Sequence, residues 1–186
     1  RGDWEAMNFE GGSGASILEN VEVRYAGMTN PQNRDYRDAI MLRNNGDATN
    51  GGGTVFRNVR VREVAWTGIR IMNGAPTLDN VDVQGAGNVP FHFELSASPE
   101  LLAVTSSNNG AEGVWFTTGA VNQPQSWDVT TMPYLITGDL TVNSTLTLGP
   151  GVVVKMNPGA LISVNGTLIT QDRKSTPSEL QSPYVI

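Results

Sequence analysis

One six-residue pattern occurs three times in the chain, as LENVEV at 18–23, FRNVRV at 56–61 and LDNVDV at 78–83. The apolar first residue, the asparagine and the two valines keep their places, whereas the charged positions change sign. Valine alternating with a polar residue is typical of a β-strand with one buried face. Its return at a distance predicts that the three segments are equivalent parts of a repeating structure.

A second short apolar pattern recurs along almost the whole chain. It reads IML at 40–42, IRI at 69–71, FHF at 91–93, VWF at 114–116, YLI at 134–136 and VVV at 152–154. No segment sustains a 3.6-residue apolar rhythm, and several short strands in a period of about 20 residues are typical of a β-solenoid. The sequence therefore predicts an all-β fold, a right-handed parallel β-helix of about seven coils, with residues 1–170 as a single domain and 171–186 as a C-terminal tail or cap. The longer steps place two loop insertions, near 29–38 and 44–53.

Stacking the coils gives the repeated asparagine a structural role. Strands one coil apart pair in parallel about 4.8 Å apart, so equivalent residues lie above one another. We expect Asn20, Asn58 and Asn80 to form a ladder of amide hydrogen bonds at a bend, because asparagine also tolerates the left-handed backbone that a tight bend needs. The next repeat, PELLAV at 99–104, places Ala103 at the asparagine position, so the ladder ends after three residues.

The charged positions of the pattern form two further predicted columns. One contains Glu22, Arg60 and Asp82, and the other contains Glu19, Arg57 and Asp79. Opposite charges on adjacent strands attract and like charges repel, so the alternation favours this register of coils. Each exposed pair contributes only about 0.2–1 kcal/mol.

Composition excludes several classes of partner. The net charge is −6 and no basic tract is present, which argues against nucleic acid as the main partner. No run of 18 apolar residues occurs, so we expect no membrane insertion. The chain has no cysteine, and it therefore contains no disulfide.

Two longer segments carry a resemblance to a known family. GDWEAMNF at 2–9 with ILENVEVRYAG at 17–27, and PYLITGDLTVNSTLTLGPGVVVKMNPGALISVNGTLIT at 133–170, resemble the right-handed parallel β-helix repeat module of large secreted bacterial proteins. The resemblance implies an exported protein, extracellular or at the cell surface. Two features depart from the family: the chain has Glu5 and Ala6 after Trp4 where the family has Gly-Ile, and the tail does not match. The family also places a G-T-L segment before a G-D-W segment, which implies a piece of a longer solenoid or a unit of a tandem array.

The recurrent apolar strand presents two outward columns of side chains. The first is predicted to contain Met41, Arg70, His92, Trp115, Leu135 and Val153, and the second Arg43, Met72, Glu94, Thr117, Thr137 and Lys155. From these we take Arg70, His92, Glu94 and Trp115 as a candidate ligand-binding stripe, because an indole beside polar groups suits a sugar ring. The alternative is that His92 is an ordinary exposed side chain between buried Phe91 and Phe93.

The resemblance also raises the question of catalysis, since parallel β-helices of this kind include polysaccharide lyases and glycosidases. A glycosidase needs two carboxylates about 5–10 Å apart. Glu94 is the single acid in the two outward columns, so the sequence predicts no catalytic residues and favours a non-catalytic protein.

The second insertion offers a weak metal site. Asn44, Asn45, Asp47 and Asn50 supply oxygen atoms that can bind Ca²⁺, although a glycine-rich surface turn is the alternative. No other cofactor is expected. The charged residues of the first insertion, Arg34, Asp35, Arg37 and Asp38, are expected to be solvated.

These features favour one function and leave two alternatives. The first is a structural β-solenoid module of a cell-surface, surface-layer or filament protein, with other copies or neighbouring modules as end-to-end partners. The second is a carbohydrate-binding or adhesin module. The third is a polysaccharide lyase or glycosidase domain, which the lack of a carboxylate pair disfavours.

Overall fold

The computed structural model describes residues 2–13, 15–28, 37–43 and 53–171. These residues form strands and connecting turns, and no helix among them has the length and apolar character needed to span a bilayer. The first predicted outward column lies on adjacent strands, as expected for stacked coils, and it contains Met41, Arg70, His92, Trp115 and Leu135.

The strands, in chain order, are β1 (Met7–Phe9), β2 (Ile17–Glu19), β3 (Glu22–Arg24), β4 (Ile40–Leu42), β5 (Val55–Arg62), β6 (Ile69–Ile71), β7 (Thr77–Gln84), β8 (Phe91–Phe93), β9 (Glu100–Leu102), β10 (Thr105–Ser107), β11 (Val114–Phe116), β12 (Gly119–Val121), β13 (Gln125–Trp127), β14 (Tyr134–Ile136), β15 (Leu140–Val142), β16 (Thr145–Leu148), β17 (Val154–Met156), β18 (Ile162–Val164) and β19 (Thr167–Thr170). Every ladder between them is parallel. The predicted right-handed parallel β-helix is thereby confirmed.

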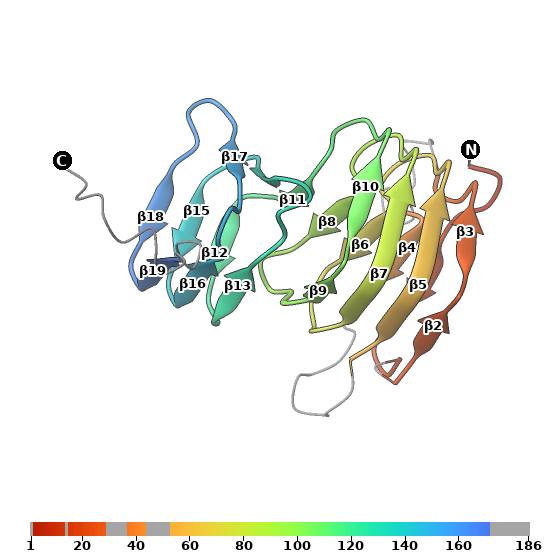
Figure 1. Cartoon of the computed structure of the whole chain (residues 1–186), viewed down its shortest axis with the longest axis horizontal. Helices are drawn as coiled ribbons and strands as arrows, with labels where there is room; N and C mark the ends of the chain where they lie inside the picture. The colour runs from red at the N-terminus through yellow and green to blue at the C-terminus, as the bar shows by residue number, and fades with distance from the viewer. Residues whose placement is uncertain (1, 14, 29–36, 44–52, 172–186) are drawn as a thin grey trace, which may run out of the picture.

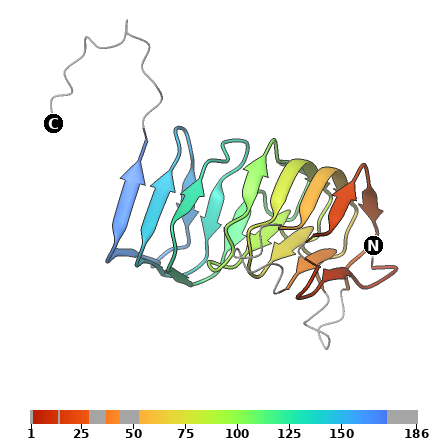
Figure 2. The ribbon, with the colours of Figure 1, turned by 90° about the horizontal axis from the view of Figure 1, so that it is seen from below.

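One sheet runs the length of the molecule, and the other faces are divided (Figure 1). The long sheet has the order β1-β4-β6-β8-β11-β14-β17. The N-terminal sheet has the order β10-β7-β5-β2, with β3 and β9 pairing with β5 and β7. Two C-terminal sheets follow, β12-β15-β18 and β13-β16-β19. The coils succeed one another along the axis (Figure 2), and about five turns are complete, slightly fewer than the seven coils expected.

Five of the six valines of the repeated pattern form buried columns, whereas Val21, which precedes β3, is half-buried. Val59 lies beside Val81, and Val61 lies between Val23 and Val83 on the neighbouring strands. All five side chains are at most 3% exposed. Burial of each valine stabilises the fold by about 1.5–3 kcal/mol relative to leaving it exposed, which makes these columns the main reason for the coil register.

The predicted asparagine ladder is present. The Asn58 amide nitrogen donates to Asn20 Oδ1 at 3.0 Å, and the Asn80 amide nitrogen donates to Asn58 Oδ1 at 2.8 Å. All three residues have left-handed backbone, with φ of 55°, 53° and 52°. Ala103 follows β9 in the same place and keeps a φ of 53°, although its side chain cannot continue the ladder.

The charge columns have the predicted register but differ in their ion pairs. Arg57 contacts both neighbours in its column, Glu19 at 3.2 Å and Asp79 at 3.6 Å. In the other column Arg60 lies between Glu22 and Asp82. These acids form their ion pairs with other arginines, Glu22 with Arg24 and Asp82 with Arg62. Arg62 reaches Asp82 diagonally on the adjacent strand, whereas Arg24 contacts Glu22 two residues away on its own strand.

One predicted column position is wrong. The last strand of the long sheet is β17, so Lys155 rather than Val153 pairs with Leu135, and Val153 lies before the strand. Lys155 lies 20 residues after Leu135, the same step that separates Leu135 from Trp115, so the register of the coils is unchanged here. The second column therefore ends at Asn157, whose backbone N–H donates to the carbonyl of Ile136.

Candidate functional site

The predicted stripe is assembled on the long sheet. Arg70 of β6, His92 of β8 and Trp115 of β11 lie on three consecutive strands in direct register. Glu94 follows β8 and points its carboxylate back to the stripe, where Oε1 lies 2.6 Å from the Arg70 guanidinium. The sequence prediction that these four residues lie together is therefore correct in geometry.

Arg70 is held by two carboxylates rather than one. Its Nη1 lies 3.6 Å from Asp38 Oδ2, and its Nη2 donates to Glu94. Asp38 was expected to be a solvated loop charge, but its side chain is only 4% exposed. Burial raises the pKa of Asp38, and hydrogen bonding and the charge of Arg70 oppose that rise. Glu94 was predicted to be the single acid in the two outward columns, but Asp38 also contacts Arg70 on this face.

This carboxylate pair does not form a hydrolytic site. The Arg70 guanidinium lies between Asp38 and Glu94, and it neutralises both. A glycosidase needs the space between its two carboxylates for the glycosidic bond and water. The three side chains form a partly buried ion-pair network, whose oxygen atoms are further satisfied by Thr117, which donates to Glu94 Oε2 at 3.3 Å.

His92 is a buried neutral residue rather than an exposed one. It is 8% exposed, and burial together with the nearby charge of Arg70 lowers its pKa to about 4, against the opposing effect of Glu94. Its Nε2 has no hydrogen-bond partner among the described residues. Its ring stacks on Trp115 at 5.1 Å between centroids, with 25° between the planes.

That stack limits the predicted sugar contact. One face of the Trp115 indole is covered by His92, and Leu135 occupies the neighbouring position on the other side. A shallow hollow of about 390 Å³ begins there, lined by Trp115 and by Leu135, Thr137, Lys155, Asn157 and Asn88. The exposed part of the stripe is therefore its C-terminal end, and Lys155 was assigned to the wrong column by the sequence.

The predicted metal residues Asn44, Asn45, Asp47 and Asn50 lie outside the described part of the chain. Elsewhere, among the residues that are described, no group of three or more His, Cys, Asp or Glu side chains is arranged to hold a metal ion.

A second asparagine ladder was not predicted. The Asn143 amide donates to Asn122 Oδ1 at 2.9 Å, and the Asn165 amide donates to Asn143 Oδ1 at 3.0 Å. These residues follow the strands of one C-terminal sheet, and the signal in the sequence is Val-Asn at 121–122, 142–143 and 164–165. The pair of letters is too short to stand out without the strand assignment.

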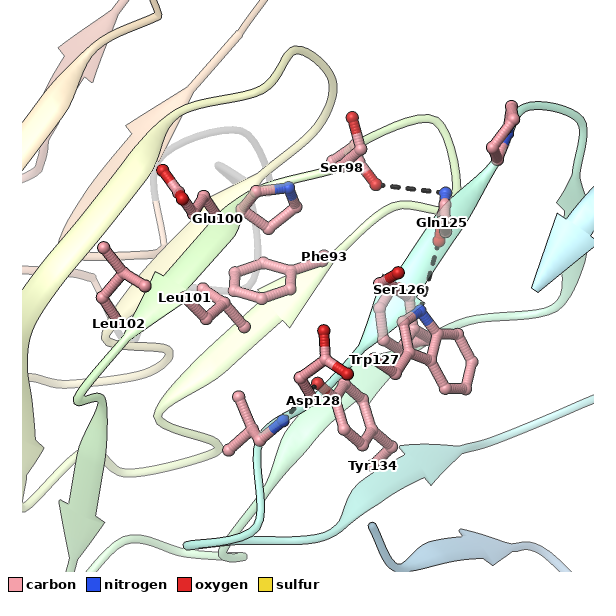
Figure 3. A pocket seen from close by; sticks show the side chains of 15 residues that line it. Phe93, Ser98, Glu100, Leu101, Leu102, Gln125, Ser126, Trp127, Asp128 and Tyr134 are labelled. Carbon is pink, nitrogen blue, oxygen red and sulfur yellow. Dashed lines mark hydrogen bonds between the residues drawn. The ribbon is translucent and has the colours of Figure 1, made fainter. Parts of the chain in front are cut away.

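A larger cleft of about 440 Å³ was also missed (Figure 3). It lies where the N-terminal sheet stops at β9 and one of the C-terminal sheets begins at β13. Its inner wall includes Phe93, Phe116, Trp127 and Tyr134, and its rim carries Glu100 and Asp128. No sequence pattern indicates this cleft, because the interruption depends on two strands failing to pair.

The C-terminal coil presents apolar side chains to solvent. Ile162, Val164 and Leu168 are 39%, 46% and 38% exposed. Their partners one coil earlier, Leu140, Val142 and Leu146, are at most 1% exposed. The difference follows from stacking, because the earlier residues are covered by the last coil, whereas no described coil covers the last one.

Comparison of the chain with protein-family models, with curated proteins and with solved structures found no match. The function is therefore argued from the geometry above.

Proposed function

We propose that this chain is a non-catalytic structural module of an exported bacterial cell-surface, surface-layer or filament protein, and that it joins its neighbours end to end. The observation that carries the proposal is the exposed apolar column of the last coil, Ile162, Val164 and Leu168. Inward-facing residues of a solenoid are normally covered by the next coil or by a polar cap. A further coil, from a neighbouring module or a second copy, would bury them as Leu140, Val142 and Leu146 are buried.

The N-terminal end supports the same arrangement. The inward-facing Leu18 of β2 is only half-buried, whereas Phe56 beside it on the next coil is fully buried, and Trp4 of the first coil is 39% exposed. An apolar surface at each end of a parallel solenoid is suited to head-to-tail stacking. Such a contact is heterologous, and it yields a filament unless its rotation closes a ring.

Sedimentation velocity across a concentration series tests the proposal. We expect the wild-type chain to associate as its concentration rises, and Val164→Asp to weaken that association by about tenfold or more, equivalent to ~1.4 kcal/mol. Ser163→Asp is the matched control, because it adds the same charge to the same strand on the outward-facing side. Unaltered association of Val164→Asp would contradict the proposal.

The measurement is repeated on a chain that ends at residue 171. If residues 172–186 cap the last coil, their removal should strengthen association through the uncovered apolar column. A chain that remains a strict monomer with and without these residues would exclude end-to-end assembly.

A carbohydrate-binding role is the second candidate, and the hollow beside Trp115 is the observation that favours it. Its mixture of Leu135 with Thr137, Lys155 and Asn157 offers an apolar surface beside hydrogen-bonding groups, as sugar sites require. A glycan array tests it: binding should be lost in Trp115→Ala and kept in Trp66→Ala, a matched exposed tryptophan. The absence of any bound glycan would remove this candidate.

A further inference from the structure

The cleft between β9 and β13 is bordered by two strands that each have one paired side. Strand β9 pairs with β7, and β13 pairs with β16. Within the described residues no ladder joins β9 to β13, although they are successive strands at this face of the solenoid. The long sheet continues past this point through β8, β11 and β14, so the coils stay connected behind the cleft.

The hydrogen-bond pattern directs backbone groups of both strands into the cleft. The Glu100 N–H donates to the carbonyl of Pro76 on the β7 side, at 2.9 Å. Successive residues of a strand direct their peptide groups to opposite sides, so the N–H and C=O of Leu101 point to the cleft. On the other wall the Trp127 carbonyl accepts from Gly149 at 2.9 Å, on the β16 side. The same alternation directs the peptide groups of Ser126 to the cleft.

Prolines limit the length of these free edges. Pro99 and Pro124 each lie two residues before the cleft-facing position and line the cleft. Because proline has no N–H, each wall offers its donor at a single central residue. Proline is also one of the devices by which an edge strand avoids pairing with long foreign strands. The cleft therefore has the hydrogen-bonding capacity for a short segment.

The wall of the cleft is apolar and does not present an aromatic face to a sugar. Trp127 stacks against Phe116 at 4.8 Å and against Tyr134 at 4.9 Å between ring centroids, and all three residues are at most 3% exposed. Its Nε1 lies 3.2 Å from Gln125 Oε1, and the Gln125 amide donates to Leu95 and Ala97 carbonyls. These contacts fix the wall and leave an apolar edge for an aliphatic side chain.

The rim of the cleft is acidic on both sides. Glu100 lies on β9 and Asp128 directly follows β13, and no lysine, arginine or histidine is among the lining residues that the structure describes. Leu102, which is 44% exposed, lies beside Glu100. Acidic groups around an apolar, hydrogen-bonding groove favour a ligand that combines a cationic side chain with aliphatic ones.

We propose that this cleft binds a short extended peptide segment carrying lysine or arginine, by adding it as a strand between β9 and β13. Main-chain hydrogen bonds to Leu101 and Ser126 supply the affinity, and Glu100 and Asp128 select the basic side chain. The volume of about 440 Å³ lies within the range of specific ligand sites. The site is independent of the end surfaces, so the test of end-to-end assembly does not decide it.

The probe is a random heptapeptide library displayed on phage, selected on the full chain at low salt. We expect the selected peptides to be enriched in lysine and arginine and to lack proline at their central positions. Binding of a selected synthetic peptide is then measured by isothermal titration. Ser126→Pro removes the cleft-facing donor without touching the β16 ladder and should weaken binding by about tenfold, the effect of a lost hydrogen bond of ~1.4 kcal/mol.

Ser126→Ala is the matched control, because it changes the side chain but keeps the N–H, and its affinity should equal that of the wild type. The double substitution of Glu100→Gln with Asp128→Asn should weaken binding severalfold and reduce its dependence on salt. A peptide N-methylated at its centre should bind about tenfold more weakly to the wild-type chain, which tests strand addition even if Ser126→Pro fails to fold. Failure to enrich any peptide, or equal affinity of the N-methylated peptide, would overturn the proposal.

Discussion

The two halves of the solenoid each stack asparagines at a bend, but they do so at different corners of the coil and with different backbones. In the N-terminal half the asparagines of the ladder have left-handed backbone, with φ between 52° and 55°. In the C-terminal half Asn122, Asn143 and Asn165 form an equally regular ladder without positive φ. Amide stacking is therefore separable from backbone conformation, and only the first ladder uses asparagine for both.

The end of the first ladder supports this separation. Ala103 keeps the left-handed conformation at φ 53° although alanine gains nothing from it. A left-handed non-glycine residue costs about 1–2 kcal/mol, so the neighbouring coil must impose the bend through strand pairing and core packing. In the N-terminal half the stacking of coils imposes the bend, and asparagine lowers the free-energy cost of its left-handed backbone.

The largest expected effect is a loss of stability on substitution in the core, which is packed differently in the two halves. The C-terminal half depends on the aromatic stack around Trp127, whereas the N-terminal half packs columns of valine with isoleucine, leucine and phenylalanine. Trp127→Ala should lower the free energy of unfolding by about 3–5 kcal/mol, because it removes a buried aromatic and leaves a cavity. Urea denaturation followed by circular dichroism measures this loss. Trp66→Ala, at a site 37% exposed, is the control and should cost much less; equal losses would contradict the assignment.

The next effect concerns the sheet that both halves share. The folded-state pKa of His92 is about 4, below its unfolded value of about 6.5, so the unfolded chain takes up a proton first as pH falls. The contribution of His92 to stability is therefore complete above pH ~6.5 and is lost toward pH ~4, by about 2–3 kcal/mol. Subtracting the curve of His92→Phe from that of the wild type isolates it, with Arg70 and Glu94 unchanged. If the free energies of unfolding of the wild type and of His92→Phe change equally with pH, His92 is not a buried neutral residue.

A smaller effect would extend the first ladder. Ala103→Asn should raise the free energy of unfolding by about 1 kcal/mol, because asparagine tolerates left-handed backbone and its amide can donate to Asn80. Ala103→Gly relieves the backbone alone and serves as the control. Thermal denaturation compares the two variants. A destabilised Ala103→Asn would mean that the fourth coil has no room for the amide.

The smallest effect tests register in the N-terminal half. Arg60→Glu places a carboxylate between Glu22 and Asp82, and we expect about 1 kcal/mol of destabilisation that shrinks as salt is added. Arg60→Gln, which removes the charge without adding repulsion, should cost only a few tenths of a kcal/mol. Chemical denaturation at low and high salt distinguishes them, and identical behaviour of the two variants would count against close stacking of this column.

Sequence periodicity predicted the parts of the fold that repeat, and it failed where the same residues fit two registers. The first ladder was predictable because Asn20, Asn58 and Asn80 sit inside a six-residue pattern. Val153 was placed in the first column instead of Lys155, because the run VVVKM at 152–156 can be read as a strand in two registers that differ by two residues. Alternation alone cannot distinguish the two registers.

The candidate sites were predictable only as far as one sheet determines them. Register brought Arg70, His92 and Trp115 together, as expected. The burial of His92 and the approach of Asp38 depend on what covers the sheet, which periodicity does not specify. The cleft depends on β9 and β13 remaining unpaired, and two strands of suitable composition give no sign in the sequence that they will not pair.

The most direct test of the central claim compares glycine with alanine at the middle of each ladder. Asn58 and Asn143 each make two amide hydrogen bonds to their neighbours, so replacing either one removes the same number. At position 58 glycine should be more stable than alanine by about 1 kcal/mol, because glycine adopts positive φ without strain. At position 143 the order should reverse, with glycine less stable than alanine by about 0.5–1 kcal/mol. Equilibrium denaturation of the four variants measures both differences; the same order at both positions would contradict the claim that only the first ladder depends on left-handed backbone.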